Sequence, residues 1–461
     1  MKNEKRIRKK LTDHLSGTQM IALGFLTVIL VGTFLLMLPC MNREGVWTPF
    51  VDAMFMSTTS VCVTGLTLVN IYEYWNIFGQ IIILILIQIG GVGVVTMSIL
   101  VMMIFRKKVS LKDRMLIQET YSAHSMRGLV NLTRKILKGI VIVEGIGAVF
   151  YAFAFIPEYG PLRGSWISLF MSISAFCNAG MEVVGGDSLT AFVGHPLINL
   201  VTMTLIVVGG IGFFVWWDLI DVTKKWRKNG PRKWFQKLNL HSKIVLTVTA
   251  VLIFGGAAVI FVLEYTNPAT LGNLTFLEKV QAALFQSVTT RTAGFYTINQ
   301  ASFRETSSLI SAVLMFIGGS PAGTAGGVKT MTIALVFACT MSVVKGDKDT
   351  VVYRRSIPED TVKKAVAVCS ISMSFVGLMT ILMTMVEKAP LLTVLYEVVS
   401  ALGTVGLSMN FTSMLSFLGK IIIIFCMYIG RIGPISLLIA FRMRGKRKDR
   451  LQYAREDVSV G

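Results

Sequence analysis

Long apolar runs without charged side chains dominate the chain. A helix needs roughly 20 apolar residues to cross the ~30 Å hydrocarbon core of a bilayer. Six uncharged runs meet that requirement, at residues 14–41, 74–105, 188–217, 244–263, 306–328 and 365–386. Two more, at 139–157 and 421–440, contain one interior charge each. The pattern predicts an all-α polytopic membrane protein with eight spans, the first of them retained rather than cleaved as a signal peptide.

The charge distribution predicts how these spans are oriented. Only 15% of the 461 residues are charged and 53% are hydrophobic, whereas soluble domains carry about 25% charged residues. The net charge of +20 is segregated, because 36 of the 45 Lys and Arg lie in segments 1–17, 106–138, 223–243, 345–364 and 442–461. These segments alternate with pairs of spans, so the positive-inside rule predicts that all five, including both termini, are cytoplasmic. A soluble nucleic-acid-binding protein would not sort its charge in this way.

The segments predicted to lie outside carry an acidic set. Eleven carboxylates fall there: Glu44, Asp52, Glu73, Glu158, Glu182, Asp187, Glu264, Glu278, Glu305, Glu387 and Glu397. An acidic outer mouth attracts cations. An ordinary solvated loop surface explains any single one of them equally well.

Between the paired spans lie four stretches that are too short or too polar to cross a bilayer, at 47–65, 165–180, 277–294 and 391–406. Each begins with a short amphipathic helix and ends at a glycine: Gly65, Gly180, Gly294 or Gly406. The separations of 115, 114 and 112 residues are nearly constant, which indicates four tandem repeats. Other offsets agree, since the residues six positions earlier are Thr59, Ser174, Val288 and Ser400.

These re-entrant stretches predict an ion pathway. Irregular backbone at membrane depth cannot face lipid, so it must line a water-filled path. Glycine allows the backbone to aim successive carbonyls inward, and rings of carbonyls replace the hydration shell of a cation. Four unrelated helix-ending glycines would not be expected to stand in register. The predicted cation-binding filter comprises Val61, Cys62, Val63, Thr64, Gly65, Phe176, Cys177, Asn178, Ala179, Gly180, Thr290, Arg291, Thr292, Ala293, Gly294, Leu402, Gly403, Thr404, Val405 and Gly406.

The second span of each repeat carries a glycine motif, at 89–93, 208–212, 317–321 and 429–433. Small residues let membrane helices approach closely, so packing is its expected role. In the third repeat the motif opens into a run too rich in glycine to hold a helix, and a break there is well placed to gate the pore. A kink that relieves helix crowding is the alternative. The predicted gate residues are Gly318, Gly319, Ser320, Gly323, Thr324, Gly326, Gly327 and Lys329.

In the fourth repeat Arg431 stands where the other repeats have glycine. An arginine at the bilayer centre costs about 2.5 to 3.5 kcal/mol or more and nearly always faces a cavity. On a cation path it would act as an electrostatic barrier, paired with Asp218 or Glu144. The alternative is a structural ion pair between spans.

Five sequence motifs together resemble the Trk/Ktr/HKT superfamily of potassium transporters, specifically its Ktr-type membrane subunit, over about residues 18–442. They are Ser-Val-Cys-Val-Thr-Gly at 60–65, Cys-Asn-Ala-Gly-Met at 177–181, Thr-Arg-Thr-Ala-Gly-Phe at 290–295, Gly-Thr-Val-Gly-Leu-Ser at 403–408 and Ile-Gly-Arg-Ile-Gly-Pro at 429–434. The stretch Ser-Pro-Ala-Gly at 320–323 departs from the family by its richness in Pro and Gly, which leaves the stiffness of the gate undetermined.

The resemblance implies a potassium filter at the four glycines, an intramembrane gating loop at 318–327 and a pore arginine at Arg431. Some plant relatives that prefer sodium have serine at the first filter glycine, so Gly65 favours potassium. The resemblance also implies a plasma-membrane homodimer with one pore per subunit, sodium as an activating ion, and a cytosolic ring of RCK-type regulatory subunits that bind ATP or ADP. This chain has no Walker A sequence and no G-x-G-x-x-G after a strand, so nucleotide effects would arrive through that separate protein.

The expected layout is four repeats separated by cytoplasmic segments. The repeats are 18–105, 136–222, 244–344 and 365–441, and the segments are 1–17, 106–135, 223–243, 345–364 and 442–461. A sodium- or proton-coupled symporter is the nearest alternative, although such folds usually carry inverted repeats. A membrane-embedded enzyme is not expected, because the four histidines lack metal-ligand spacing, and no covalently bound cofactor is expected.

Overall fold

The computed structural model describes residues 17–94, 96–97, 129–229 and 234–433. The described chain is mostly helical, as the apolar runs predict. Its helices are α2 (Gly17–Leu36), α3 (Phe50–Cys62), α4 (Ile71–Tyr74), α5 (Ile77–Val92), α8 (Leu129–Tyr159), α9 (Pro161–Cys177), α10 (Pro196–Gly210), α11 (Phe213–Asn229), α12 (Trp234–Lys237), α13 (Leu240–Glu264), α14 (Phe276–Thr289), α15 (Glu305–Phe316), α16 (Thr330–Lys345), α17 (Glu359–Val386), α18 (Leu391–Gly403) and α19 (Phe417–Ile432). One hairpin joins β1 (Val351–Val352) to β2 (Arg355–Ser356).

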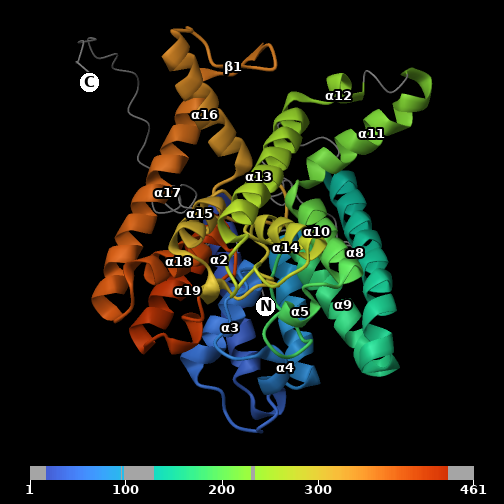
Figure 1. Ribbon diagram of the computed structural model, residues 1–461, viewed down its shortest axis with the longest axis vertical. Helices are drawn as coiled ribbons and strands as arrows, with labels where there is room; N and C mark the ends of the chain where they lie inside the picture. The colour runs from blue at the N-terminus through green and yellow to red at the C-terminus, as the bar shows by residue number, and fades with distance from the viewer. Residues whose placement is uncertain (1–16, 95, 98–128, 230–233, 434–461) are drawn as a thin grey trace, which may run out of the picture.

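Four helices, α2, α8, α13 and α17, are long and apolar enough to cross a membrane within the described part of the chain. Their outward faces expose large apolar side chains, among them Phe34, Phe153, Val262 and Met385. Exposed apolar surface on this scale marks an interface with lipid or protein. In Figure 1, α8 and α17 lie on opposite flanks of the molecule.

The four short helices α3, α9, α14 and α18 lie between these long helices and are largely buried. Pro49, Gly160–Pro161 and Pro390 start three of them, and a Thr275–Glu278 capping box starts α14, because proline and capping boxes both suit a helix N-terminus. Residues in the left-handed conformation end α3, α9 and α18, where Val63, Asn178 and Thr404 have φ of 56°, 59° and 51°; after α14 the residue with positive φ is Thr292, at 67°. Each chain segment therefore turns sharply just before its filter glycine.

The glycine motif near the end of α5, α10 and α19 packs closely against other helices, as predicted. A methyl group on Gly90, Gly209 or Gly430 would overlap the carbonyl group of Val61, Phe176 or Leu402, respectively. These carbonyls belong to the ends of α3, α9 and α18. The absence of a side chain thus lets α5, α10 and α19 lie directly against the short helices.

The second helices also break more often than the sequence predicted. The expected break is present in the third repeat, where α15 ends at Phe316 and α16 begins at Thr330. A second break was not predicted: α10 and α11 bend by 99°, because Gly212 has φ of 91°, outside the helical region. Counting that bent pair as one span gives up to five spans by length and composition among the described residues, so the predicted count of eight stays a prediction.

Two segments predicted to be cytoplasmic lie at the same end of the molecule. The β1–β2 hairpin and α12 are at the top of Figure 1, and the loops around α4 are at the bottom. Phe235 and Tyr353 stack edge to face with ring centroids 6.0 Å apart, and the Tyr353 hydroxyl lies 2.6 Å from Thr247 Oγ1. The described parts of these basic segments are therefore on one side, as the charge pattern required.

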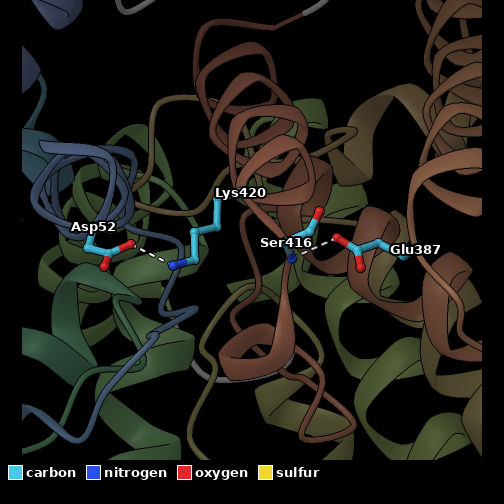
Figure 2. Close-up of polar contacts among 4 residues, drawn as sticks. All are labelled: Asp52, Glu387, Ser416 and Lys420. Carbon is cyan, nitrogen blue, oxygen red and sulfur yellow. Dashed lines mark hydrogen bonds and ion pairs between the residues drawn. The ribbon is translucent and has the colours of Figure 1, made fainter. Parts of the chain in front are cut away.

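The first repeat, which contains α3, lies next to the fourth repeat, which contains α18 and α19. Figure 2 shows Lys420 on α19 reaching Asp52 on α3, with 2.6 Å between Nζ and Oδ1. In the same view Glu387 Oε1 accepts the backbone N–H of Ser416 at 2.9 Å, which holds the start of α19 to the end of α17. A chain of four units whose ends meet in this way forms a closed ring.

Candidate ion pathway

The four predicted filter glycines converge on one point. All have positive φ, between 65° for Gly180 and 101° for Gly65. A methyl group on Gly65 would lie 3.2 Å from Cα of Gly180 and 3.3 Å from Cα of Gly406, and one on Gly294 would lie 3.0 Å from Cα of Gly180. Residues separated by more than a hundred positions therefore meet at the centre of the molecule.

The backbone carbonyls beside these glycines follow a cyclic order. A methyl group on each glycine would press against a carbonyl oxygen of another segment. The pairs are Gly65 with Ala179, Gly180 with Ala293, Gly294 with Val405 and Gly406 with Thr64. Each of the four units thus supplies one carbonyl to the same narrow ring, the arrangement that replaces a cation's hydration shell.

Hydroxyl groups brace the ring from behind. The N–H groups of Gly65 and Gly406 donate to Thr59 Oγ1 at 3.0 Å and to Ser400 Oγ at 3.1 Å, and the Met181 N–H donates to Ser174 Oγ at 3.1 Å. These hydroxyls occupy the register position six residues before each glycine.

In the third unit that position is Val288, which has no hydroxyl. There Thr289 donates to the Phe295 carbonyl at 2.5 Å instead. Sequence reasoning missed this residue, although its position directly after Val288 was the available signal.

Two threonines in the ring keep free hydroxyls. The Oγ1 atoms of Thr64 and Thr404 are buried and have no hydrogen-bond partner among the described residues. The C-terminal ends of α3 and α18 lie immediately before them, and helix C-termini carry partial negative charge. Both features favour a cation next to these side chains.

Several predicted filter residues contribute backbone only, because their side chains lie away from the ring. Phe176 packs edge to face on Trp216, with centroids 5.7 Å apart. The Cys177 thiol lies 3.5 Å from Gln88 Oε1. Arg291 lines a separate small cavity between α10, α13 and α14. Only the main chain of these positions can reach an ion in the ring.

A carboxylate also lies behind the second filter segment. Glu144 on α8 is 7% exposed and accepts hydrogen bonds from Gln88 Nε2 at 3.1 and 3.2 Å. The sequence offered one signal, since Glu144 is the single charge in the run 139–157.

Outside the ring lies a vestibule of about 330 Å³ that all four filter glycines line. Of the eleven carboxylates predicted to surround the mouth, Glu182 and Asp187 line it. Glu397 was misassigned, because it is fully buried and accepts hydrogen bonds from Ser408 Oγ and Thr412 Oγ1 at 2.7 and 2.5 Å. That carboxylate braces a loop instead of facing solvent.

The two vestibule carboxylates differ in environment. Burial raises the pKa of Glu182 to about 7, although the N–H groups of Gly185 and Val184 oppose the shift. Asp187 is exposed and accepts a hydrogen bond from the Tyr296 hydroxyl at 2.5 Å. The charge of Glu182 therefore changes near neutral pH.

Beneath the ring, the loop between α15 and α16 links the second and fourth units. Thr324 Oγ1 donates to the Phe176 carbonyl at 3.1 Å, and Ser320 N–H donates to the Gly210 carbonyl at 2.9 Å. On the opposite side, a methyl group on Gly326 would overlap the Thr404 side chain. The loop therefore lies directly against two of the four filter segments.

Arg431 ties this loop to the first unit. Its Nη1 donates to the Thr324 carbonyl at 2.5 Å, and its Nη2 donates to the Gly90 carbonyl. The predicted pairing with a carboxylate is wrong. Asp218 instead accepts from the backbone N–H and the side chain of Asn239, and Glu144 is held by Gln88. Backbone carbonyls of Thr324 and Gly90 therefore accept the hydrogen bonds of the Arg431 guanidinium, in place of a carboxylate.

An inner cavity of about 620 Å³ lies on the far side of the loop. Arg431, Lys329 and Lys364 line it together with Pro321 and Gly323. The Lys329 ammonium donates to the Ala325 carbonyl at 2.7 Å, so it also holds the loop. The loop, Lys329 and Arg431 therefore lie between the ring and the inner cavity.

A ring of backbone carbonyls with a cavity on each side, inside a bundle of apolar helices, is the arrangement expected of a membrane protein that transports cations. Comparison with known proteins agrees: residues 5–449 match the TrkH family, described as a cation transport protein. The chain belongs to this family. It is a family of cation transporters and not of enzymes, and the resemblance read from the filter motifs is confirmed.

Individual relatives cover nearly the whole chain. The "Potassium/sodium uptake protein NtpJ" of Enterococcus hirae is 37% identical over 99% of both chains. The "Ktr system potassium uptake protein B" of Bacillus subtilis is 40% identical over 96% of both chains. In fold, the chain is similar to the potassium transporter TrkH from Vibrio parahaemolyticus, with a TM-score of 0.73, 16% identity, and 92% of this chain and 84% of that chain covered.

Proposed function

We propose that this protein takes up potassium through a channel-like pore built from four tandem repeats and eight spans. The observation that carries the proposal is the convergence of Gly65, Gly180, Gly294 and Gly406, each beside a carbonyl of another segment. The proposed filter is 61–65, 176–180, 290–294 and 402–406. Carbonyl rings select ions by cavity size or by the field of their dipoles, and both depend on the backbone conformation that these glycines allow.

Potassium is the proposed cargo for two reasons. The names of the Enterococcus hirae and Bacillus subtilis relatives both specify potassium uptake. The first filter position is Gly65, the residue that the family resemblance associates with potassium preference. Sodium is the second candidate cargo, because the Enterococcus hirae name includes it.

The loop at 318–327 and Arg431 are the proposed gate. Thr324 supports this role, since its carbonyl accepts from Arg431 and its hydroxyl donates to the filter segment at Phe176. Movement of the loop would break both contacts and open a path from the ring to the inner cavity. Arg431 and Lys329 would then set the electrostatic barrier that prevents free leak.

The proposed setting is a plasma-membrane homodimer whose basic segments face the cytosol. The Bacillus subtilis relative is named as part of a Ktr system, and the family resemblance supplies an RCK-type ring that binds ATP or ADP as the regulatory partner. The hairpin at β1–β2 and α12, which lie at one end, are the proposed docking side. Sodium is proposed as an activating ion.

Rubidium uptake into proteoliposomes that contain only this protein tests the transport proposal. We expect potassium to block uptake and equal sodium to leave it largely intact, without any co-ion. If uptake stops unless sodium or protons are supplied in stoichiometric amounts, the protein is a symporter and the channel-like mechanism fails. If sodium competes as well as potassium, the selectivity assigned to Gly65 fails.

The gate is tested by Thr324→Val, which keeps the shape and removes one hydrogen bond worth about 1 kcal/mol. We expect rubidium flux to rise about fivefold, the change in an equilibrium that such an energy produces. Thr340→Val is the matched control, because Thr340 lies exposed on α16 and bonds its own helix at Val336. Equal flux in both variants would contradict the gating role.

A further inference from the structure

The inner cavity, with its volume of about 620 Å³, concentrates positive charge. Its described lining includes Lys329, Lys364 and Arg431 and no carboxylate. Lys329 and Arg431 donate to backbone carbonyls, which carry no full charge. Lys364 forms no ion pair with a described residue, whereas the adjacent Lys363 pairs with Glu359 at 2.7 Å. Three cations therefore share one cavity, and no described residue that lines it supplies a counter-charge.

The first turn of α16 adds to this positive potential. Met331 and Thr332, which belong to that turn, line the cavity. The first backbone N–H groups of a helix have no intrahelical acceptor, and the aligned peptide dipoles give a helix N-terminus partial positive charge. This turn contains no acidic side chain. An anion is therefore the ligand that the electrostatics of the cavity favour.

Apolar side chains from three helices form the other part of the lining. They are Ile21 and Phe25 on α2, Leu335 on α16 and Val368 on α17. Helices α2 and α17 are two of the four that are long and apolar enough to cross a membrane. Thr18 and Lys364 lie within the first two turns of these helices, and the ends of spanning helices lie at the depth of the lipid headgroups. The cavity therefore reaches headgroup depth and has both basic and apolar walls.

This combination selects a phosphate group that carries an apolar tail. Forked guanidinium donors and lysine ammonium groups both bind phosphate, and basic pockets between spanning helices bind anionic lipid headgroups. The volume falls within the roughly 300–1,000 Å³ that is usual for small-molecule sites. A free phosphate ion would leave the apolar side chains against water, whereas an acyl chain would cover them.

We propose that an anionic phospholipid binds in the inner cavity, with its phosphate at the three cations and an acyl chain along the apolar side chains of α2 and α17. The site is independent of the identity of the transported ion, since it rests on the charge, size and lining of the cavity. Its position has a functional consequence, because Arg431 and Lys329 hold the loop beneath the ring. A bound headgroup places negative charge beside both of these side chains.

The first test is thermal unfolding of the purified full-length protein in detergent with added phosphatidylglycerol, phosphatidylcholine or glycerol 3-phosphate. A ligand that binds only the folded state raises the melting temperature with its concentration. We expect phosphatidylglycerol to raise it by about 2 °C or more over phosphatidylcholine. Glycerol 3-phosphate has the same phosphate chemistry without a tail and should have little effect. An equal shift with glycerol 3-phosphate would identify a site for free anions and would overturn the lipid proposal.

Two adjacent lysines on α17 separate the cavity from the general basic surface. Lys364→Gln removes a charge from the lining and should reduce the phosphatidylglycerol shift by at least about half. Lys363→Gln is the matched control, because Lys363 is 70% exposed and lies outside the described lining. It should keep the full shift. Equal shifts in the two variants would mean that the lipid binds a non-specific basic surface, and the proposal would fail.

Native mass spectrometry of the full-length protein gives an independent readout by counting retained lipids. We expect phosphatidylglycerol to be retained in preference to phosphatidylcholine, with an apparent affinity about fivefold weaker in Lys364→Gln than in Lys363→Gln. Equal retention of the two lipids by the unaltered protein would contradict the proposal. Neither measurement uses transport, so failure of the potassium proposal leaves both of them interpretable.

Discussion

The carbonyl ring and the layer directly beneath it are built from the same four units but differ in symmetry. In the ring, every unit supplies a positive-φ glycine and a neighbouring carbonyl, and a hydroxyl braces each segment. In the layer below, the first, second and fourth units supply the end of a helix, the third supplies an extended loop, and the fourth also supplies an arginine. Both layers are formed by the same four sequence repeats, but the four repeats contribute alike only to the ring.

The difference follows from what each layer has to do. A ring of carbonyl dipoles surrounds an ion evenly only if all four units contribute alike. A barrier has to change between states, and a loop held by a few hydrogen bonds at one side changes more readily than four packed helix ends. Near-symmetry in the ring and asymmetry below it therefore fit the proposed filter and the proposed gate.

Breaking the symmetry of the ring should have the largest effect. In Gly65→Ser, the added Cβ would lie 2.7 Å from the Ala179 carbonyl oxygen, at a φ of 101° that serine rarely adopts. We expect discrimination between potassium and sodium to fall by at least about tenfold, or ~1.4 kcal/mol, in rubidium uptake with competing ions. Gly255→Ser on α13 is the control, because nothing lies within 4 Å of its Cβ position. Unchanged competition would remove Gly65 from the filter.

Removing the charge from the lower layer should have the next largest effect. Arg431→Ala eliminates the positive charge and its hydrogen bonds to backbone carbonyls, so we expect unidirectional rubidium flux to rise about fivefold, corresponding to about 1 kcal/mol of barrier. Arg431→Lys keeps a charge without the forked geometry and should rise less. Selectivity should not change in either variant. If Arg431→Ala conducts like the unaltered protein, the arginine is structural only.

A smaller effect is expected from titration above the ring. Because burial raises the pKa of Glu182 to about 7, this vestibule carboxylate is charged above that pH and neutral below it. Loss of one negative charge weakens cation attraction, so apparent potassium affinity should be about twofold lower near pH 6 than near pH 8. Glu182→Gln should abolish this dependence. Glu158→Gln, an exposed carboxylate outside the vestibule, should keep it, and a persistent dependence in Glu182→Gln would contradict the assignment.

The smallest effect is expected where the first and fourth units meet. The Asp52–Lys420 pair is partly solvent-screened, with side chains 34% and 22% exposed, so its coupling should be about 0.5 to 1 kcal/mol. A double-mutant cycle of Asp52→Asn and Lys420→Met, followed by chemical unfolding in detergent, measures it. Rubidium selectivity should stay unchanged in all three variants. A coupling of zero would show that helix packing alone closes the ring.

Much of this architecture could be predicted from residue order. Apolar run length predicted the long helices, and the spacing of Gly65, Gly180, Gly294 and Gly406 predicted which backbone segments meet. Both signals are local or periodic: a run of 20 apolar residues is long enough to span a bilayer, and glycine is the residue that adopts positive φ most readily. The break at 318–327 followed from the same reasoning, because a run dense in glycine that also contains proline strongly disfavours a helix.

Other features depended on the tertiary structure. The bend at Gly212, the hydroxyl of Thr289 in place of Val288, the carbonyl partners of Arg431 and the buried position of Glu397 all rest on contacts between distant segments. A polar side chain takes whichever partner the packing brings within about 3 Å, and sequence position does not encode that distance. The sequence by itself therefore determined the helices and the glycines of the ring, whereas only the tertiary structure decided which side chains face the ion path, because that depends on how four separate units pack around one axis.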